Sequence, residues 1–247
     1  MFGQNDVHVM VDIETAGTNP GDIILQVGAV AFVLGDDSTV LEGKNGYFKI
    51  GISVEDSEAC GFTTNNDTLT WWSEQDTELR HQVWGGTASV SQFLYAFIDY
   101  LAQFGDKDNI YIWANDPDFD CTLIKEYYVH TGLDDYLPWN FRNNRSFRTV
   151  KALYPELYEE AKKNFINDTK HGALTDAIWQ AKVIRHILLC RSQAEIAKRD
   201  ERIAELEAQL FAAQDARHRL GHKRDEQAAE ISRLNGVIAK YEEEFHH

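Results

Sequence analysis

Acidic residues and one histidine stand where their side chains can act on a substrate. Asp12 and Glu14 end the apolar stretch "VMVDIET", and side chains two apart on a strand point to the same face. Asp176 follows His171 by five residues in "HGALTDA", where a long helical stretch begins. Carboxylates bind divalent cations, and histidine can take a proton from water near neutral pH. Together these groups are typical of a metal-dependent hydrolase. Taken singly, Asp12 and Glu14 can also be acids at the edge of a core, and Asp176 can be a first-turn acid favoured by the helix dipole.

A third acidic group follows a short predicted strand. "WANDPDFDCTLI" places Asp116, Asp118 and Asp120 at the start of a predicted helix. Asp118, directly after Pro117, is the natural capping residue of that helix. Asp120 then lies in the first turn, from which an aspartate can turn back toward the edge of a sheet.

The segments that must carry these residues alternate between strand and helix patterns. Apolar runs separated by turn residues predict an antiparallel meander, and later segments alternate strand with helix, which indicates a mixed sheet covered by helices. The predicted strands are residues 7–13, 23–33, 46–52 and 109–115. The predicted helices lie in residues 67–75, 89–104 and about 118–132, and a last helix begins near residue 174.

The C-terminal part has a seven-residue repeat of apolar positions. One column is Leu189, Ile196, Ile203, Leu210, Arg217, Arg224, Ile231 and Ile238; the other is Ser192, Arg199, Leu206, Ala213, Leu220, Gln227, Leu234 and Tyr241. Eleven of these sixteen positions are apolar, which predicts a coiled coil, and isoleucine in one column with leucine in the other favours two strands. We therefore expect a domain at residues 1–187, a coiled-coil helix at 188–245 and a homodimer. A helical hairpin that turns near Gly221 is the competing fold, since polar residues interrupt the seam there.

Charge and composition limit the function further. The 247 residues have a formal net charge of −16, and 28 of the 40 acidic residues precede residue 187. Such an acidic chain is not a general nucleic-acid binder, but its carboxylates can converge on cations. Cys60, Cys121 and Cys190 form no CxxC pair, which predicts a reducing, cytoplasmic location. We expect neither a membrane span nor a signal peptide.

The three acidic motifs, in this order, resemble the DnaQ-like (DEDD) 3′–5′ exonuclease superfamily of the histidine-bearing, DEDDh type. "DIET" matches its first motif, "NDPDFDCTLI" its second and "HGALTDA" its third. "TLTWW", "PWNF", "RSFRT" and "HGALTDAIWQA" are similar to a subgroup of mycobacterial and phage 3′–5′ exoribonuclease-like proteins. The resemblance covers about residues 6–187 and implies an RNase H-like fold and a phage origin. The run before Asp120 is more acidic than in relatives, so Asp116 or Asp118 remains an alternative ligand.

The resemblance also implies a mechanism. Asp12, Glu14, Asp120 and Asp176 would hold two Mg²⁺ or Mn²⁺ ions, and His171 would act as general base. The enzyme would hydrolyse single-stranded RNA or DNA from the 3′ end to nucleoside 5′-monophosphates. The alternatives are a catalytically silent nuclease fold that acts through its coiled coil, and another phosphohydrolase of RNase H-like architecture.

Residues outside the motifs are candidates for holding the nucleic acid. Thr15 and Ala16 are placed to contact the terminal nucleotide through backbone groups, and Trp71 and Trp72 can shape the substrate, although core packing accounts for at least one tryptophan. Residues 142–151 carry four cations and no acid, which predicts a phosphate-facing wall. The cations at that wall are Arg142, Arg145, Arg148 and Lys151. A solvated loop with salt bridges is the alternative.

Overall fold

A mixed sheet forms the centre of the N-terminal part. The computed structural model describes residues 6–34, 46–166 and 171–245. In these ranges the strands lie in the order β3-β2-β1-β4-β5. Their bounds are β1 Val7–Thr15, β2 Ile24–Phe32, β3 Tyr47–Gly51, β4 Ile110–Ala114 and β5 Asn144–Ser146. The first three strands pair antiparallel, which confirms the meander, whereas β4 pairs parallel with β1 and with β5.

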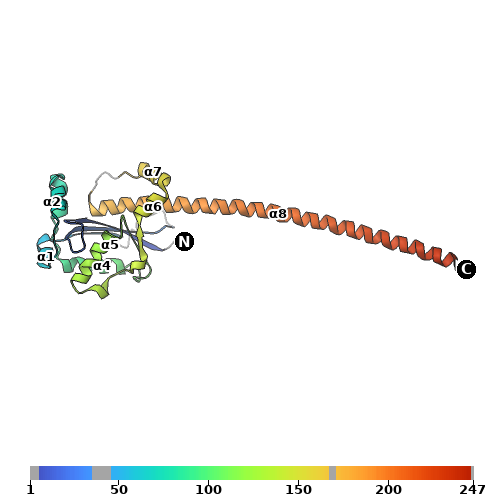
Figure 1. The fold of residues 1–247 in the computed structure, drawn as a ribbon, viewed down its shortest axis with the longest axis horizontal. Coiled ribbons are helices and arrows are strands. Elements are labelled where there is room, and N and C mark those ends of the chain that lie inside the picture. Colours follow the sequence, from blue (N-terminus) through green and yellow to red (C-terminus); the bar gives the residue numbers. More distant parts are fainter. Residues whose placement is uncertain (1–5, 35–45, 167–170, 246–247) are drawn as a thin grey trace. The chain divides into compact units, whose positions relative to one another are not determined.

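Alternation along β1 divides the core into two layers. Val9, Val11 and Ile13 belong to one buried cluster, which includes the apolar faces of α4 (Val90–Ala102) and α5 (Asp120–His130). Met10 belongs to a second cluster on the other face, together with Ala177 and other residues from the beginning of α8 (Ala173–Phe245). Figure 1 shows α4 and α5 on one side of the strands and the first turns of α8 on the other. Because side chains alternate, Asp12 and Glu14 point to the same face as Met10.

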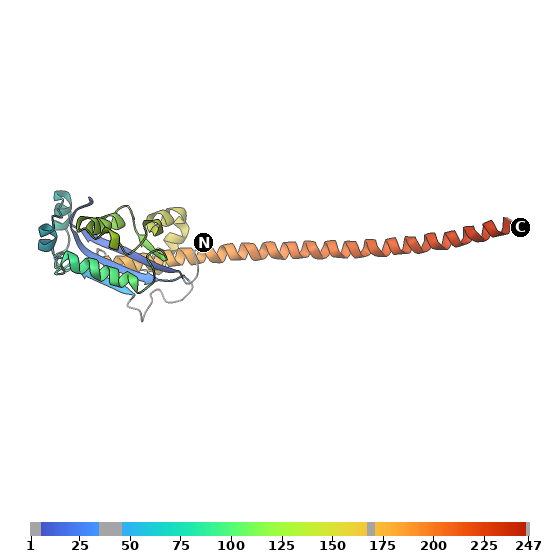
Figure 2. The same ribbon diagram turned by 90° about the horizontal axis from the view of Figure 1, so that it is seen from below.

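The remaining helices are short. They are α1 Val54–Ala59, α2 Asn66–Ser73, α3 Thr77–Trp84, α6 Phe147–Leu153 and α7 Pro155–Asn164, with two 3₁₀ turns, Asp134–Tyr136 and Phe141–Asn143. The sequence patterns did not indicate α1, α3, β5, α6 or α7. Of these, α1, β5 and α6 have 6, 3 and 7 residues, too few for a clear apolar period. The longer α4 was predicted, and Ser89 begins it with a capping box in which Gln92 participates. Figure 2 shows α4 running alongside the strands.

Helix α8 runs for 73 residues without interruption, through Gly221. A single continuous helix is therefore confirmed over the hairpin. The chain divides into two compact units, residues 1–191 and 192–247. In the second unit the predicted seam is exposed: Ile203 and Leu206 are 46% and 47% accessible. Pairing of this helix with a second copy remains a prediction. No helix in the described ranges has the length and apolar character that a membrane crossing requires.

Candidate active site

The end of β1 places two carboxylates in a partly dry environment. Glu14 is 9% exposed, and Asp12 is partly buried. Burial, followed by the neighbouring carboxylates of Asp120, Glu14 and Asp176, raises the pKa of Asp12 well above its usual value. Burial and the charges of Asp176 and Asp120 raise the pKa of Glu14 to about 8. The charges of Asp120 and Asp176 act on both carboxylates of β1, so the fold does bring these four acids together.

Asp120 joins the cluster from the first residue of α5. Its side chain is 4% exposed, and burial is the main cause that raises its pKa to about 7. The backbone N–H of Asp116 lies 3.4 Å from its Oδ2 and donates to it. Asp120 is among the charges acting on Asp12 and Glu14, whereas Asp116 and Asp118 are not. Of the three acids of this loop, Asp120 is thus the one placed beside Asp12 and Glu14.

The other two acids of the loop have structural partners or face solvent. Asp118 was predicted to cap α5, but this helix begins with no side-chain cap. Instead, the carboxylate of Asp116 accepts the backbone N–H of Asp118 at 3.3 Å and pairs with the Arg148 guanidinium at 2.7 Å. The prediction was wrong because the path of the loop determines which side chain can reach the first N–H groups of a helix. Here the loop turns around Asp116, two residues before Asp118.

Asp176 and His171 come from the start of α8. His171 has a φ of 67°, and its backbone N–H donates to Asp176 Oδ2 at 3.0 Å. This left-handed conformation is uncommon outside glycine and reverses the chain just before the helix. One ligand atom from each of Glu14, His171 and Asp176 lies within 4.8 Å of the other two. The five-residue spacing in "HGALTDA" therefore lets the Asp176 carboxylate accept a hydrogen bond from the backbone N–H of His171, and it brings both side chains close to Glu14.

Two residues of β2 fix the start of α8 against the sheet. A Cβ on Gly28 would collide with the backbone of Ala173 and Leu174, so only glycine permits this approach. The buried Gln26 side chain accepts the N–H of Ala173 at 3.1 Å. Gly28 lies opposite Asp12, and Gln26 opposite Glu14, in the β1–β2 register. The helix is therefore held directly beside the two carboxylates of β1.

Gln180 belongs to the site, and the sequence analysis missed it. Its Nε2 donates to Asp12 Oδ1 at 2.8 Å, and the residue is 6% exposed. It lies four residues after Asp176, hence on the same face of the helix. That spacing is the signal that could have found it. A neutral donor of this kind orients the Asp12 carboxylate without adding a charge.

The four residues predicted to contact a terminal nucleotide differ in their surroundings. Trp71 is 40% exposed, and its ring meets the His171 ring edge-on, with centroids 5.4 Å apart. Trp72 is 2% exposed and donates from Nε1 to the carbonyl of Thr15 at 2.8 Å, so it is the tryptophan for which core packing accounts, and a substrate contact of Trp72 stays a prediction. The Thr15 hydroxyl donates to the Gly17 carbonyl.

Ala16 does not have free backbone groups. It is completely buried, its N–H donates to Ile23 at 2.8 Å, and its carbonyl accepts from Asn65 at 2.9 Å. Both backbone groups of Ala16 are therefore already bonded within the protein, and a contact of Ala16 with a nucleotide stays a prediction. The loop after β1 bonds instead to the segments that follow it.

The predicted phosphate-facing wall is divided. Arg148 lies near the acids through its ion pair with Asp116, and its side chain is 59% exposed. Arg145 instead donates to the carbonyls of Arg142 and Asn144 and covers the Tyr111 ring at 4.8 Å. Tyr111 pairs with His8, about 13 Å before Asp12 along β1. The backbone of Arg145 pairs with Trp113 near the end of β4, and its side chain turns back along β4 toward Tyr111.

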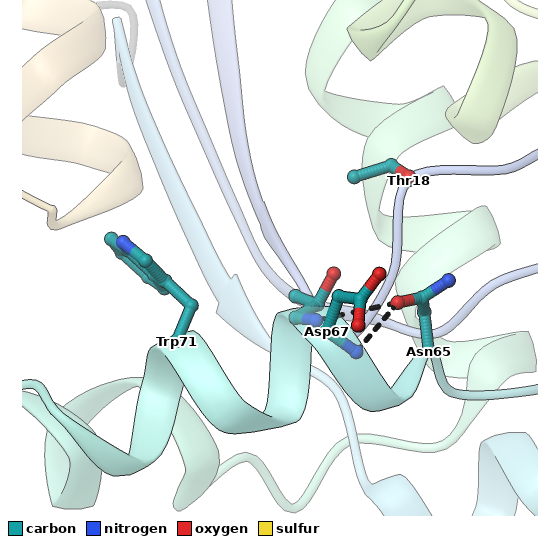
Figure 3. A pocket seen from close by; sticks show the side chains of 5 residues that line it. Thr18, Asn65, Asp67 and Trp71 are labelled. Carbon is teal, nitrogen blue, oxygen red and sulfur yellow. Dashed lines mark hydrogen bonds between the residues drawn. The ribbon is translucent and has the colours of Figure 1, made fainter.

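A pocket of about 410 Å³ borders the site. It is lined by Thr18, Asn65, Asp67, Thr68 and Trp71. Figure 3 shows Asp67 and Trp71 on α2, with Thr18 on the loop after β1 across from them. Asn65 caps α2 by accepting the N–H groups of Asp67 and Thr68. Trp71 both lines this pocket and contacts the His171 ring.

The fold is that of a DEDDh nuclease domain. The solved nuclease domain of 3'hExo, a DEDDh family member bound to rAMP, is 14% identical, with a TM-score of 0.50 over 74% of this chain and 92% of that chain. Cell-death related nuclease 4 (CRN-4) is 11% identical, with a TM-score of 0.46 over 75% of this chain and 66% of that chain. Comparison with curated proteins gives no match.

The family follows from the sequence match. The model of the 3'-5' exoribonuclease Rv2179c-like domain matches residues 7–188, most of the chain. The chain belongs to this family and is a 3′–5′ exonuclease. This confirms the predicted DnaQ-like superfamily and the predicted fold. A silent scaffold is accordingly set aside.

Proposed function

We propose that the protein hydrolyses single-stranded nucleic acid from the 3′ end and releases nucleoside 5′-monophosphates. The observation that carries the proposal is the convergence of Asp12, Glu14, Asp120 and Asp176 beside His171. Four acids in one partly buried place repel one another, and divalent cations relieve that cost. RNA is the first substrate to test, because the family model describes an exoribonuclease domain.

The donor set fits divalent cations. Asp12, Glu14, Asp120 and Asp176 offer only carboxylate oxygens, the ligands that Mg²⁺ and Mn²⁺ prefer. We assign these four residues as the ligands of two such ions. When bound, the ions would supply a nucleophilic hydroxide and stabilise charge at the scissile phosphate.

His171 is the proposed general base. Its ring lies within reach of Glu14 and Asp176, on a backbone held by its own hydrogen bond to Asp176. A base must be aimed at the attacking water, and the fixed turn at His171 supplies that aim. Trp71, against the His171 ring, fixes one side of the imidazole.

The pocket beside Trp71 is the proposed place of the terminal nucleoside. A half-exposed indole is a stacking surface for a base of any kind. Arg148, exposed beside the acidic cluster, is the proposed contact for the following phosphate. Its ion pair with Asp116 lies at the surface, so that pair contributes little and can be exchanged for a phosphate.

The C-terminal helix is proposed to join two copies. Exposed isoleucine and leucine side chains recur at seven-residue spacing, at Ile196, Ile203 and Leu210 and again at Ile231 and Ile238. Burying such a stripe against a second copy removes apolar surface from water. The dimer is independent of the chemistry and is tested separately.

The test is a degradation assay on matched RNA and DNA single strands of one sequence, with Mn²⁺ or Mg²⁺. Strands labelled at the 5′ end should give a ladder that shortens step by step, and strands labelled at the 3′ end should release labelled mononucleotide at once. Asp176→Asn is the inactive control. If RNA and DNA strands both stay intact with the wild-type protein and either metal, the proposal is refuted.

A further inference from the structure

One stretch of α8 has a charge opposite to that of the chain. Residues 217–224, which we call the basic band, contain Arg217, Arg219, Lys223 and Arg224 and no acidic residue. The formal net charge of the whole chain is −16. All four cationic side chains are exposed. The band is thus a local concentration of positive charge on an acidic protein.

Acids of the same helix neutralise the band only in part. Arg219 pairs with Asp215 at 2.7 Å, and Arg224 approaches Asp225 at 3.3 Å. Among the residues that the structure describes, no ion pair involves Arg217 or Lys223. Exposed ion pairs are weak because water and salt screen them, so all four cations remain available to an external anion.

The band also interrupts the apolar seam. Arg217 and Arg224 occupy seam positions, whereas Leu210 before them and Ile231 after them are apolar. When two copies pair in register, each of these arginines lies opposite the same arginine of the other copy. Like charges at such close range are unfavourable. A polyanion that binds the band offsets this repulsion. The cations therefore suit an external anion better than they suit the seam.

We propose that the basic band binds the phosphate backbone of the single strand whose 3′ end this enzyme degrades. The identity of the anion rests on the proposed function, and the charge of the band is independent of it. Arginine donates two parallel hydrogen bonds to a phosphate, and lysine acts as a point charge. Such contacts are independent of sequence and release counterions, so binding must weaken as salt rises.

The experiment measures binding by fluorescence anisotropy, with the full chain in EDTA so that hydrolysis cannot occur. The probe is a labelled mixed-sequence RNA of about 30 nucleotides, long enough to pass beyond one binding module. The test variant is Arg219→Gln with Lys223→Gln, which leaves the seam positions unchanged. The matched control is Arg233→Gln with Lys240→Gln, on the same helix outside the band; Arg219 and Arg233 each begin in an ion pair, with Asp215 and Glu230.

The band variant should bind several-fold more weakly, and the slope of log K against log salt should fall by about 1.4, or about 0.7 for each lost contact. The control should keep the slope of the wild type, and light scattering should show the same mass for all three proteins. Equal weakening in both variants, or no weakening in either, would overturn the band as a site. A poly-glutamate peptide that fails to displace the labelled RNA would exclude an acidic protein as the partner. If the peptide binds the chain and RNA does not, the proposal is wrong.

The two proposals can fail separately. Wild-type protein that binds RNA in EDTA but degrades nothing with Mn²⁺ would refute the proposed hydrolysis and leave the band intact. Conversely, a band variant that releases nucleotides from a trinucleotide at the wild-type rate and binds long RNA as well as the wild type would refute the band alone.

Discussion

The two units of this chain depart from the usual distribution of residues in opposite ways. In residues 1–191, Glu14 and Asp120 are charged groups kept at 9% and 4% exposure. In residues 192–247, Ile203 and Leu206 are apolar groups left 46% and 47% exposed. Both arrangements cost free energy in an isolated chain. This difference underlies the two proposals: cations as the partner of the first unit, and a second helix as the partner of the second.

Removing one buried carboxylate should give the largest effect. Asp12→Asn keeps the side-chain shape but removes a charge that senses three other acids. We expect the release of nucleotides to fall by roughly a thousandfold or more, because the cation site loses a ligand. Thermal stability without metal should stay equal or rise, since repulsion decreases. Asp118→Asn, on the exposed part of the same loop, is the control and should keep full activity.

Removing the imidazole tests the chemistry more finely than removing a ligand. His171→Ala should lower the rate by about 10²–10⁴-fold, the usual contribution of a general base. The stabilisation of the fold by Mn²⁺, followed by thermal melting, should persist, because the four carboxylates remain. Loss of that stabilisation would assign His171 to the metal instead.

The second unit can be tested in the same manner. The chain has a mass of 28.3 kDa, and light scattering should show twice that value for the full chain. Ile203→Glu should weaken association by about 3–6 kcal/mol, since two apolar side chains per dimer are lost. Phe211→Glu, 74% exposed on the same helix and outside the seam, is the matched control. A monomeric wild-type chain would contradict the coiled coil.

A smaller effect is expected from the neutral neighbour of Asp12. Gln180→Leu removes the donor at 2.8 Å from Asp12 Oδ1 while keeping similar volume. Residues that orient metal ligands typically contribute 10–100-fold to metal affinity or activity. The Mn²⁺ concentration for half-maximal activity should therefore rise. An unchanged metal dependence would reduce Gln180 to a packing residue.

The smallest effect concerns pH. The folded chain raises the pKa of Glu14 from 4.5 to about 8. Between these values the unfolded chain binds fewer protons than the folded one, so metal-free stability should fall as pH rises from about 4.5 to about 8. A fall of about 4 °C or more in melting temperature is expected, which corresponds to 1–2 kcal/mol in a domain of this size. Glu14→Gln should make the profile less steep and leave the slope that Asp12 and Asp120 contribute; a profile identical to that of the wild type would contradict the assignment.

The local patterns of the sequence were sufficient for several elements. The alternation in β1 predicts that Asp12 and Glu14 share a face, and the absence of glycine and proline from Ala173 to Leu220 predicts a long helix. These properties depend on residues a few positions apart. Ordered motifs also sufficed to identify the superfamily, because their spacing along the chain carries the match.

Other features depend on distances between segments far apart in the chain, and only the tertiary structure decided them. It placed Asp120, and not Asp116, beside the carboxylates of β1, because the loop after β4 turns around Asp116 and pairs it with Arg148. It directed the Arg145 side chain toward Tyr111 and brought Gln180 to Asp12, across 168 positions of sequence. Residue types define which groups can carry the chemistry, whereas packing of α8 on Gly28 determines which of them meet.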